Sequence, residues 1–195
     1  MLRYNKRIQI WVRKRKLKNY GFRPAQITDL DFVMSQITDG ANDGHYAKWL
    51  VEPNQAKSLR IEFERIINDS SMVRNSERGL EVIAAKLFIY GQAHDDQVGF
   101  FLYAEKIPGS ADTDLELYKI GIRKDRQRCG HGRRIVQLAV AYAPPAVNLF
   151  ARCYQPSKGM FKLLQEVGFS HTKTTNNGTR ELVLTGKKLE ELKYE

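Results

Sequence analysis

The segment Ile120-Gly121-Ile122-Arg123-Lys124-Asp125-Arg126-Gln127-Arg128-Cys129-Gly130-His131-Gly132-Arg133-Arg134 decides the fold of this chain. It predicts an apolar strand that ends at Ile122, a basic turn with two glycines, and a helix. Glycines let the backbone curl until successive N–H groups converge on one point. The following helix adds unpaired N–H groups and the positive end of its dipole. The segment therefore predicts a site for a phosphate or pyrophosphate group.

Two glycines at this spacing are a weak signal by themselves, and the alternative is a tight turn into a helix. A dinucleotide fingerprint would need a third glycine, and a nucleoside triphosphate loop would need Gly-Lys-Ser/Thr. Neither is present. Neighbouring basic residues raise the local positive potential and favour an anion; these are Arg123, Lys124, Arg126, Arg128, Arg133 and Arg134.

Helices dominate the chain between residues 25 and 68. A strand is predicted over residues 20–25, and Thr28 is predicted to cap the next helix, with Asp31 completing a capping box. A second helical region covers residues 45–68, with an interruption near Pro53.

Strands are predicted from residue 80 onward. Antiparallel strands cover residues 81–90, 98–106 and 115–122, and they precede a helix over 134–142 and a strand over 147–154. A helix over 158–167 ends at Gly168, and an Asn177-Gly178 turn closes a final hairpin of residues 171–175 and 179–184. This order predicts an α/β domain with a mixed sheet.

Composition is that of one soluble globular domain. The chain has 195 residues, of which 42% are hydrophobic and 28% charged. It has neither the roughly 18 consecutive apolar residues of a membrane span nor the core of a signal peptide, so a cytoplasmic protein without a membrane partner is expected. The spacings of its two cysteines and four histidines predict no bound metal.

Positive charge is concentrated at the N-terminus. The net charge of the chain is +10. Eight basic residues and no acidic residue precede Asn19, so the rest of the chain has a net charge of 10 − 8 = +2. Such a block is either a solvated arm or a contact for an acidic or nucleic-acid partner. Residues 7–13 also alternate polar and apolar side chains, which predicts an added strand.

The glycine segment resembles a known family signature. Gln127-Arg128-Cys129-Gly130-His131-Gly132 is similar to the Arg/Gln-x-x-Gly-x-Gly/Ala motif of the GNAT superfamily of N-acetyltransferases. Gly168-Phe169, Arg23-Pro24-Ala25 followed by Asp29, and Val98-Gly99-Phe100 resemble other family motifs. The resemblance spans roughly residues 20 to 185, and it departs at Lys124, where the family often has proline.

The resemblance implies a GNAT-like mixed, split (V-shaped) sheet with flanking helices and a C-terminal antiparallel hairpin. It divides the chain into an arm (1–19), an acetyltransferase domain (20–186) and a charged tail (187–195). It also implies that acetyl-CoA enters between the strands of residues 115–122 and 147–154, without a metal. The expected acetyl-CoA-binding residues are Ile120, Ile122, Gln127, Arg128, Cys129, Gly130, His131, Gly132, Arg133 and Ser157.

Two candidate catalytic residues follow from the resemblance. Glu116 lies where the histone-acetylating branch of the family carries its general base, and the alternative is an exposed strand residue. Leu164 replaces the tyrosine that serves many relatives as the acid, and Ser157 replaces a common asparagine. Tyr154 is therefore the candidate acid, with an ordinary strand aromatic as its alternative.

Three functions are compatible with these observations. The first is acetyl transfer to a small amine, a peptide N-terminus or a protein lysine, by a monomer or homodimer. The second is toxin-like acetylation of aminoacyl-tRNA, which the basic arm favours. The third is a non-catalytic scaffold that binds through the arm; Leu164 supports it, and the intact glycine loop argues against it.

Overall fold

The computed structural model describes residues 19–76, 79–92, 96–105, 114–144 and 147–186. The predicted strand over residues 7–13, nearly all of the basic arm and the C-terminal tail lie outside this part. None of the described helices has the length and apolar character needed to cross a membrane.

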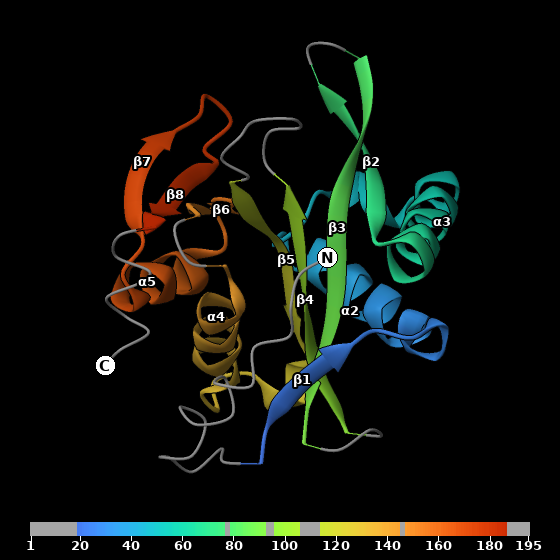
Figure 1. Ribbon diagram of the computed structural model, residues 1–195, viewed down its shortest axis with the longest axis horizontal. Coiled ribbons are helices and arrows are strands. Elements are labelled where there is room, and N and C mark those ends of the chain that lie inside the picture. Colours follow the sequence, from blue (N-terminus) through green and yellow to red (C-terminus); the bar gives the residue numbers. More distant parts are fainter. Residues whose placement is uncertain (1–18, 77–78, 93–95, 106–113, 145–146, 187–195) are drawn as a thin grey trace.

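One mixed sheet runs through the domain in the order β1-β3-β4-β5-β6-β8-β7, and β2 pairs with the far end of β3 (Figure 1). Its strands are β1 (Gly21–Pro24), β2 (Ser71–Ser76), β3 (Gly79–Gly91), β4 (Gln97–Glu105), β5 (Leu115–Ile122), β6 (Leu149–Cys153), β7 (Ser170–Thr174) and β8 (Arg180–Leu184). The helices are η2 (Ile27–Asp29), α2 (Leu30–Asn42), η3 (Lys48–Val51), α3 (Pro53–Asp69), η4 (Lys124–Arg126), α4 (His131–Tyr142) and α5 (Lys158–Val167).

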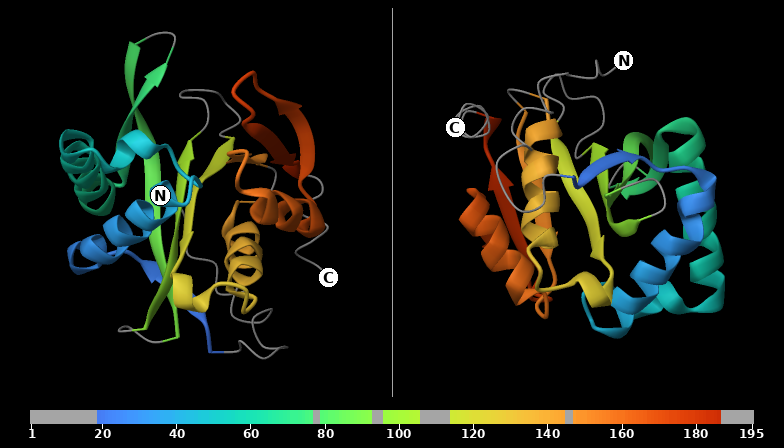
Figure 2. Two further views of the ribbon diagram at one scale, coloured as in Figure 1. Left: turned by 180° about the vertical axis from the view of Figure 1, so that it is seen from behind. Right: turned by 90° about the horizontal axis from the view of Figure 1, so that it is seen from below.

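Helices cover both faces of the sheet, as Figure 2 shows: α2 and α3 lie on one face, and α4 and α5 lie on the other. Strand β4 contributes to both cores because its side chains alternate between the faces. Phe100 and Leu102 pack in the core under α2 and α3, whereas Phe101 and Tyr103 pack in the core under α4. This burial on two sides explains the continuous apolar sequence of β4.

Strands β5 and β6 separate along their length. They pair in parallel only from Leu115 and Leu149 to Leu117 and Ala151. The register between β4 and β5 shifts just after this point, so Tyr118 is an extra residue on β5. Such a bulge bends its strand and re-aims the neighbouring side chains. The predicted split sheet is therefore confirmed.

Glycines end and start several elements as predicted. Gly168 adopts φ 115° at the end of α5, and Gly178 adopts φ 79° in the final turn. Gly130, with φ 90°, is the N-cap of α4, so this helix begins at His131 rather than at Arg134. A positive φ strains any residue with a side chain, which explains the glycines.

The sequence prediction for residues 45–76 was wrong in one element. Strand β2 was missed, because Ser71–Ser76 lacks apolar alternation and, among the side chains of residues 71–75, only Met72 is buried. The predicted interruption of the helical region near Pro53 is confirmed: the short helix η3 ends at Val51, and Pro53 is the first residue of α3. Proline suits the first helical position because that N–H needs no partner.

The predicted cap of the first helix was also wrong. The capping box is made by Gln26 and Asp29, because the chain turns helical at η2 before α2. The Asp29 carboxylate is buried and accepts hydrogen bonds at 2.6 and 2.7 Å from the Arg23 guanidinium and at 2.5 Å from Nε2 of Gln97. Asp29 therefore joins the start of α2 to strands β1 and β4.

We expect Asp29→Ala to lower the free energy of unfolding by about 3 kcal/mol, because it removes the buried carboxylate that accepts hydrogen bonds from Arg23 and Gln97. Asp31→Ala is the matched control: Asp31 pairs with Arg60 at 2.7 Å, but its side chain is 85% exposed, so about 0–1 kcal/mol is expected. Urea unfolding at pH 7 measures both values. Equal losses would contradict the assigned role of Asp29.

The contribution of Asp29 to the free energy of unfolding should depend on pH. Burial alone would raise the pKa of Asp29, but hydrogen bonds from Arg23, Gln26 and Gln97 lower it below its ordinary value. A lowered folded-state pKa gives stability that is complete above the unfolded pKa of about 4 and is lost as the pH falls through the folded value. The difference between wild type and Asp29→Ala should therefore shrink below about pH 4.

Candidate active site

A cavity of about 630 Å³ occupies the space between the separating strands. Strand β5 and the glycine loop line one side, and β6, the following turn and α5 line the other. The C-terminal end of α2 and the loop after it add a rim. This volume lies within the range of small-molecule sites, which is roughly 300–1,000 Å³.

The glycine loop forms a backbone cradle at the N-terminus of α4. Both Gly130 (φ 90°) and Arg128 (φ 62°) have left-handed backbones, and such alternation turns successive N–H groups toward one side. The sequence did not predict this conformation for Arg128, which is uncommon for a residue with a side chain and clusters at functional sites. A Cβ at Gly132 would lie 3.8 Å from Leu163, so glycine at this position leaves the cavity open.

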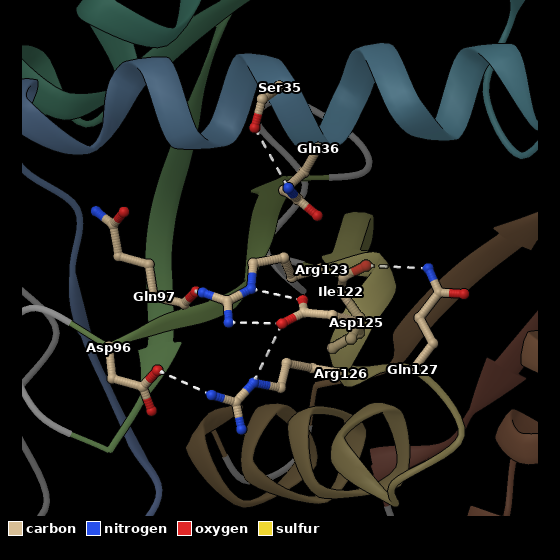
Figure 3. A network of polar contacts seen from close by, with 9 residues as sticks. All are labelled: Ser35, Gln36, Asp96, Gln97, Ile122, Arg123, Asp125, Arg126 and Gln127. Carbon is tan, nitrogen blue, oxygen red and sulfur yellow. Dashed lines mark hydrogen bonds and ion pairs between the residues drawn. The ribbon is translucent and has the colours of Figure 1, made fainter.

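Acidic partners neutralise most of the basic side chains around the loop. Arg123 binds Asp125 through two hydrogen bonds of 2.6 and 2.8 Å, and Arg126 lies 3.9 Å from Asp96 (Figure 3). Lys124 pairs with Asp39 of α2 and with Asp43 just after this helix, and Arg133 pairs with Glu166. The potential at the cradle therefore depends on backbone N–H groups and the helix dipole more than the sequence suggested.

The loop after α2 closes the cavity from a direction that the sequence did not predict. The Tyr46 hydroxyl donates to the Ile120 carbonyl at 2.5 Å, and Nδ1 of His45 lies 3.1 Å from the Ser157 hydroxyl. A Cβ at Gly40 would lie 2.6 Å from the Tyr46 ring, so glycine is needed for this packing. The sequence signal for this loop was the Gly40–Gly44 break.

Nine of the predicted site residues line the cavity: Ile120, Ile122, Gln127, Arg128, Gly130, Gly132, Arg133, Tyr154 and Ser157. The Gln127 side chain donates to the Ile122 carbonyl at 3.1 Å, which ties the loop to the end of β5 (Figure 3). Cys129 is exposed beside the cavity. His131 is buried with Nδ1 3.0 Å from the Tyr90 hydroxyl, and burial lowers the pKa of its ring. For Cys129 and His131, only the backbone N–H groups remain available to the cradle.

Glu116 lies outside the cavity lining and is buried, with 1% of its surface exposed. The alternative of an exposed strand residue is therefore wrong. One carboxylate oxygen accepts from Nε of Arg152 at 2.6 Å, and the other lies 3.2 Å from Nη2 of Arg74. This geometry suits a residue that positions Arg152, and the role of general base stays a prediction.

We expect Glu116→Gln to lower the free energy of unfolding by about 3 kcal/mol, because it removes the charge that two arginines share in a buried place. Glu64→Gln is the matched control, since Glu64 makes an exposed pair with Arg60 on α3; about 0.5 kcal/mol or less is expected. Urea unfolding compares the two. A stable Glu116→Gln protein would contradict the structural role.

Comparison with known protein families and with curated proteins finds no match. Solved structures are similar to this chain. Spermidine N-acetyltransferase from Vibrio cholerae, in complex with CoA and spermine, has a TM-score of 0.63 and 16% identity, over 88% of this chain and 98% of the other. An acetyltransferase from Thermus thermophilus has a TM-score of 0.59 and 18% identity, over 85% of this chain and 96% of the other.

A third similar structure is a candidate phosphinothricin N-acetyltransferase, with a TM-score of 0.61 and 13% identity, over 86% of this chain and 98% of the other. Identities this low establish the architecture and leave the reaction open. The likeness covers 85 to 88% of this chain. The chain therefore has the fold of the GNAT N-acetyltransferases, as its glycine segment predicted.

Proposed function

We propose that the protein is an N-acetyltransferase that transfers the acetyl group of acetyl-CoA directly to an amine. The observation that carries this proposal is the backbone cradle at the N-terminus of α4, which opens into the cavity between β5 and β6. A pyrophosphate suits such a helix N-terminus. The cavity also has room for the arm that joins the pyrophosphate to the thioester.

The free edge of β5 supports this placement of acetyl-CoA. The carbonyls of Ile120 and Ile122 accept hydrogen bonds from Tyr46 and Gln127. In a strand the N–H and C=O of one residue point to the same side, so the N–H groups of Ile120 and Ile122 face the same edge. We expect them to bind the carbonyl oxygens of the pantetheine arm and of the acetyl group.

Acetyl transfer needs a neutral amine that attacks the thioester carbon while the C–S bond breaks. A backbone N–H at the edge of β5 would stabilise the negative charge that develops on the carbonyl oxygen. The thiolate that leaves takes up a proton, and we propose the Tyr154 hydroxyl as its donor. The proton that the amine nitrogen loses returns to the Tyr154 oxygen through solvent. Tyr154 supports this role because it lines the cavity and is 42% exposed.

We expect Gly132→Glu to abolish acetyl-CoA binding, because a carboxylate would enter the anion cradle. Gly132→Ala should fold normally, because the added Cβ meets only Leu163 at ordinary van der Waals distance, and should weaken binding less. Gly21→Glu in β1 places the same charge outside the cavity and should keep the wild-type affinity. Calorimetry measures all three, and unchanged affinity in folded Gly132→Glu would refute the site.

Removal of the Tyr154 hydroxyl tests the proposed proton donor. We expect Tyr154→Phe to lower kcat by about 100-fold, which is within the usual range for an acid catalyst, and to leave the Kd for acetyl-CoA nearly unchanged. Tyr20→Phe removes a hydroxyl outside the cavity and should keep full turnover. Thiol release with a panel of amines measures kcat. A loss of less than about threefold in Tyr154→Phe would leave this tyrosine without a catalytic role.

A further inference from the structure

Basic side chains gather on the side of the cavity that faces α2 and α3. On β6, Ala151 and Cys153 pack in the core under α4, so Arg152 between them faces the opposite side. Lys119 of β5 lies on that side as well, with its ammonium over the rings of Tyr46 and Tyr118. Lys119 and Arg152 both line the cavity.

These two cations lie at the closed end of the split. Arg152 follows Ala151, the last β6 residue that pairs with β5, and Lys119 lies two residues after Leu117, the last such residue of β5. The glycine cradle begins beyond Ile122, at the open end. Lys119 and Arg152 are therefore separated from the phosphate site and lie where an acetyl group and its acceptor would meet.

Arg152 is held ready to bind an anion. Its Nε donates to Glu116, and Glu116 is held in turn by Arg74. Within the described residues, the two terminal nitrogens of Arg152 make no hydrogen bond or ion pair, and its side chain is 41% exposed. A guanidinium fixed at Nε still presents two donors that match the two oxygens of a carboxylate or phosphate group.

Lys119 lacks an anionic partner in the described part of the chain. Its Nζ lies 4.5 Å from the centre of the Tyr118 ring and 5.7 Å from that of Tyr46, and no ion pair with a carboxylate is formed. Burial lowers the pKa of Lys119 to about 8, although Glu62 and Glu116 act in the opposite direction. A partly desolvated ammonium is unfavourable without a counter-charge, and a bound anion would offset this cost.

The carboxylates that line the cavity are placed differently. Asp39 and Asp43 both pair with Lys124, at 3.8 and 3.2 Å, on the rim beside the glycine loop. Glu116, which lies outside the cavity lining, is paired with its two arginines. The closed end of the split therefore favours negative charge, and a polycation would meet Lys119 and Arg152 there with like charge.

We propose that the acceptor is a small amine that also carries an anionic group, a carboxylate or a phosphonate-like group, and that Arg152 and Lys119 bind this group. The inference rests on the proposed acetyl transfer and adds the chemical class of its acceptor. Binding of the anion at the closed end would leave the amine of the same molecule free to approach the thioester. Arg152 is then a specificity residue, and Glu116 is the residue that positions it.

Thiol release from acetyl-CoA tests the acceptor class with matched amines. The panel pairs amino acids with their carboxamides, adds 2-aminoethylphosphonate to distinguish phosphonate from carboxylate, and includes spermidine as a polycation. We expect kcat/KM for the acids to exceed that for the carboxamides by about 10- to 100-fold, the effect of a hydrogen bond to a charged group. A preference for carboxamides or for spermidine would overturn the proposal.

Substitutions of Lys119 and Arg152 test whether these residues cause the preference for acids over carboxamides. Lys119→Met and Arg152→Gln should each reduce the ratio of acid to carboxamide kcat/KM by about tenfold or more, through a higher KM for the acids. Lys57→Gln on the exposed face of α3 removes one positive charge elsewhere and should leave the ratio unchanged. Lys119→Met also serves if Arg152→Gln fails to fold, because Lys119 takes no part in the Glu116 pairs. An unchanged ratio in Lys119→Met would refute the site.

Calorimetry of the CoA-loaded protein separates this inference from the proposed function. We expect N-acetylated amino acids to bind more tightly than N-acetylated carboxamides by about tenfold or more, and Lys119→Met to remove the difference. Binding of the acids without thiol release from any amine would support the anion site and refute acetyl transfer. Thiol release with equal binding of acids and carboxamides would support acetyl transfer and refute the anion site.

Discussion

The separation of β5 from β6 after three residue pairs is the constraint on which the rest of the site depends. Backbone groups on the inner edge of β5 lose their strand partner there, and unpaired backbone groups are costly unless something else binds them. Tyr46 and Gln127 take the carbonyls of Ile120 and Ile122, which leaves N–H groups on that edge for a ligand. The same separation makes room for the cavity, and the bulge at Tyr118 turns side chains toward it.

Two buried carboxylates hold the walls of this opening. Asp29 joins the start of α2 to β1 and β4. These contacts fix the position of the helix whose C-terminal end forms part of the cavity rim. Glu116 lies where β5 and β6 still pair, and it joins Arg74 of β2 to Arg152 of β6. A buried carboxylate that is fully hydrogen-bonded fixes geometry more than it adds stability. In Glu116 the same contacts that would hinder a general base orient the guanidinium of Arg152.

The anion cradle and the cationic closed end have different physical origins. The cradle is local: Arg128 and Gly130 turn the backbone, α4 supplies its N-terminus, and nearby basic side chains are largely paired with acids. The closed end instead uses side-chain charge from Lys119 and Arg152. A ligand with phosphates at one end and an acidic amine at the other would suit this division, and the proposed pair of acetyl-CoA and an anionic acceptor has that form.

The sequence by itself determined the elements whose signals are local. Gly168 and Gly178 end and turn the chain through backbone conformations that only glycine adopts freely, and the glycine segment before α4 predicted both the cradle and the fold. Only the tertiary structure decided what surrounds the cavity beyond that segment. Tyr46 meets Ile120 across 74 residues, and Glu116 meets Arg74 and Arg152 across 42 and 36. Strand β2, which supplies Arg74, shows no alternating apolar pattern in the sequence, because few of its described side chains are buried. Periodicity records how one element meets the core, whereas contacts between elements depend on strand order and register, which no local pattern encodes.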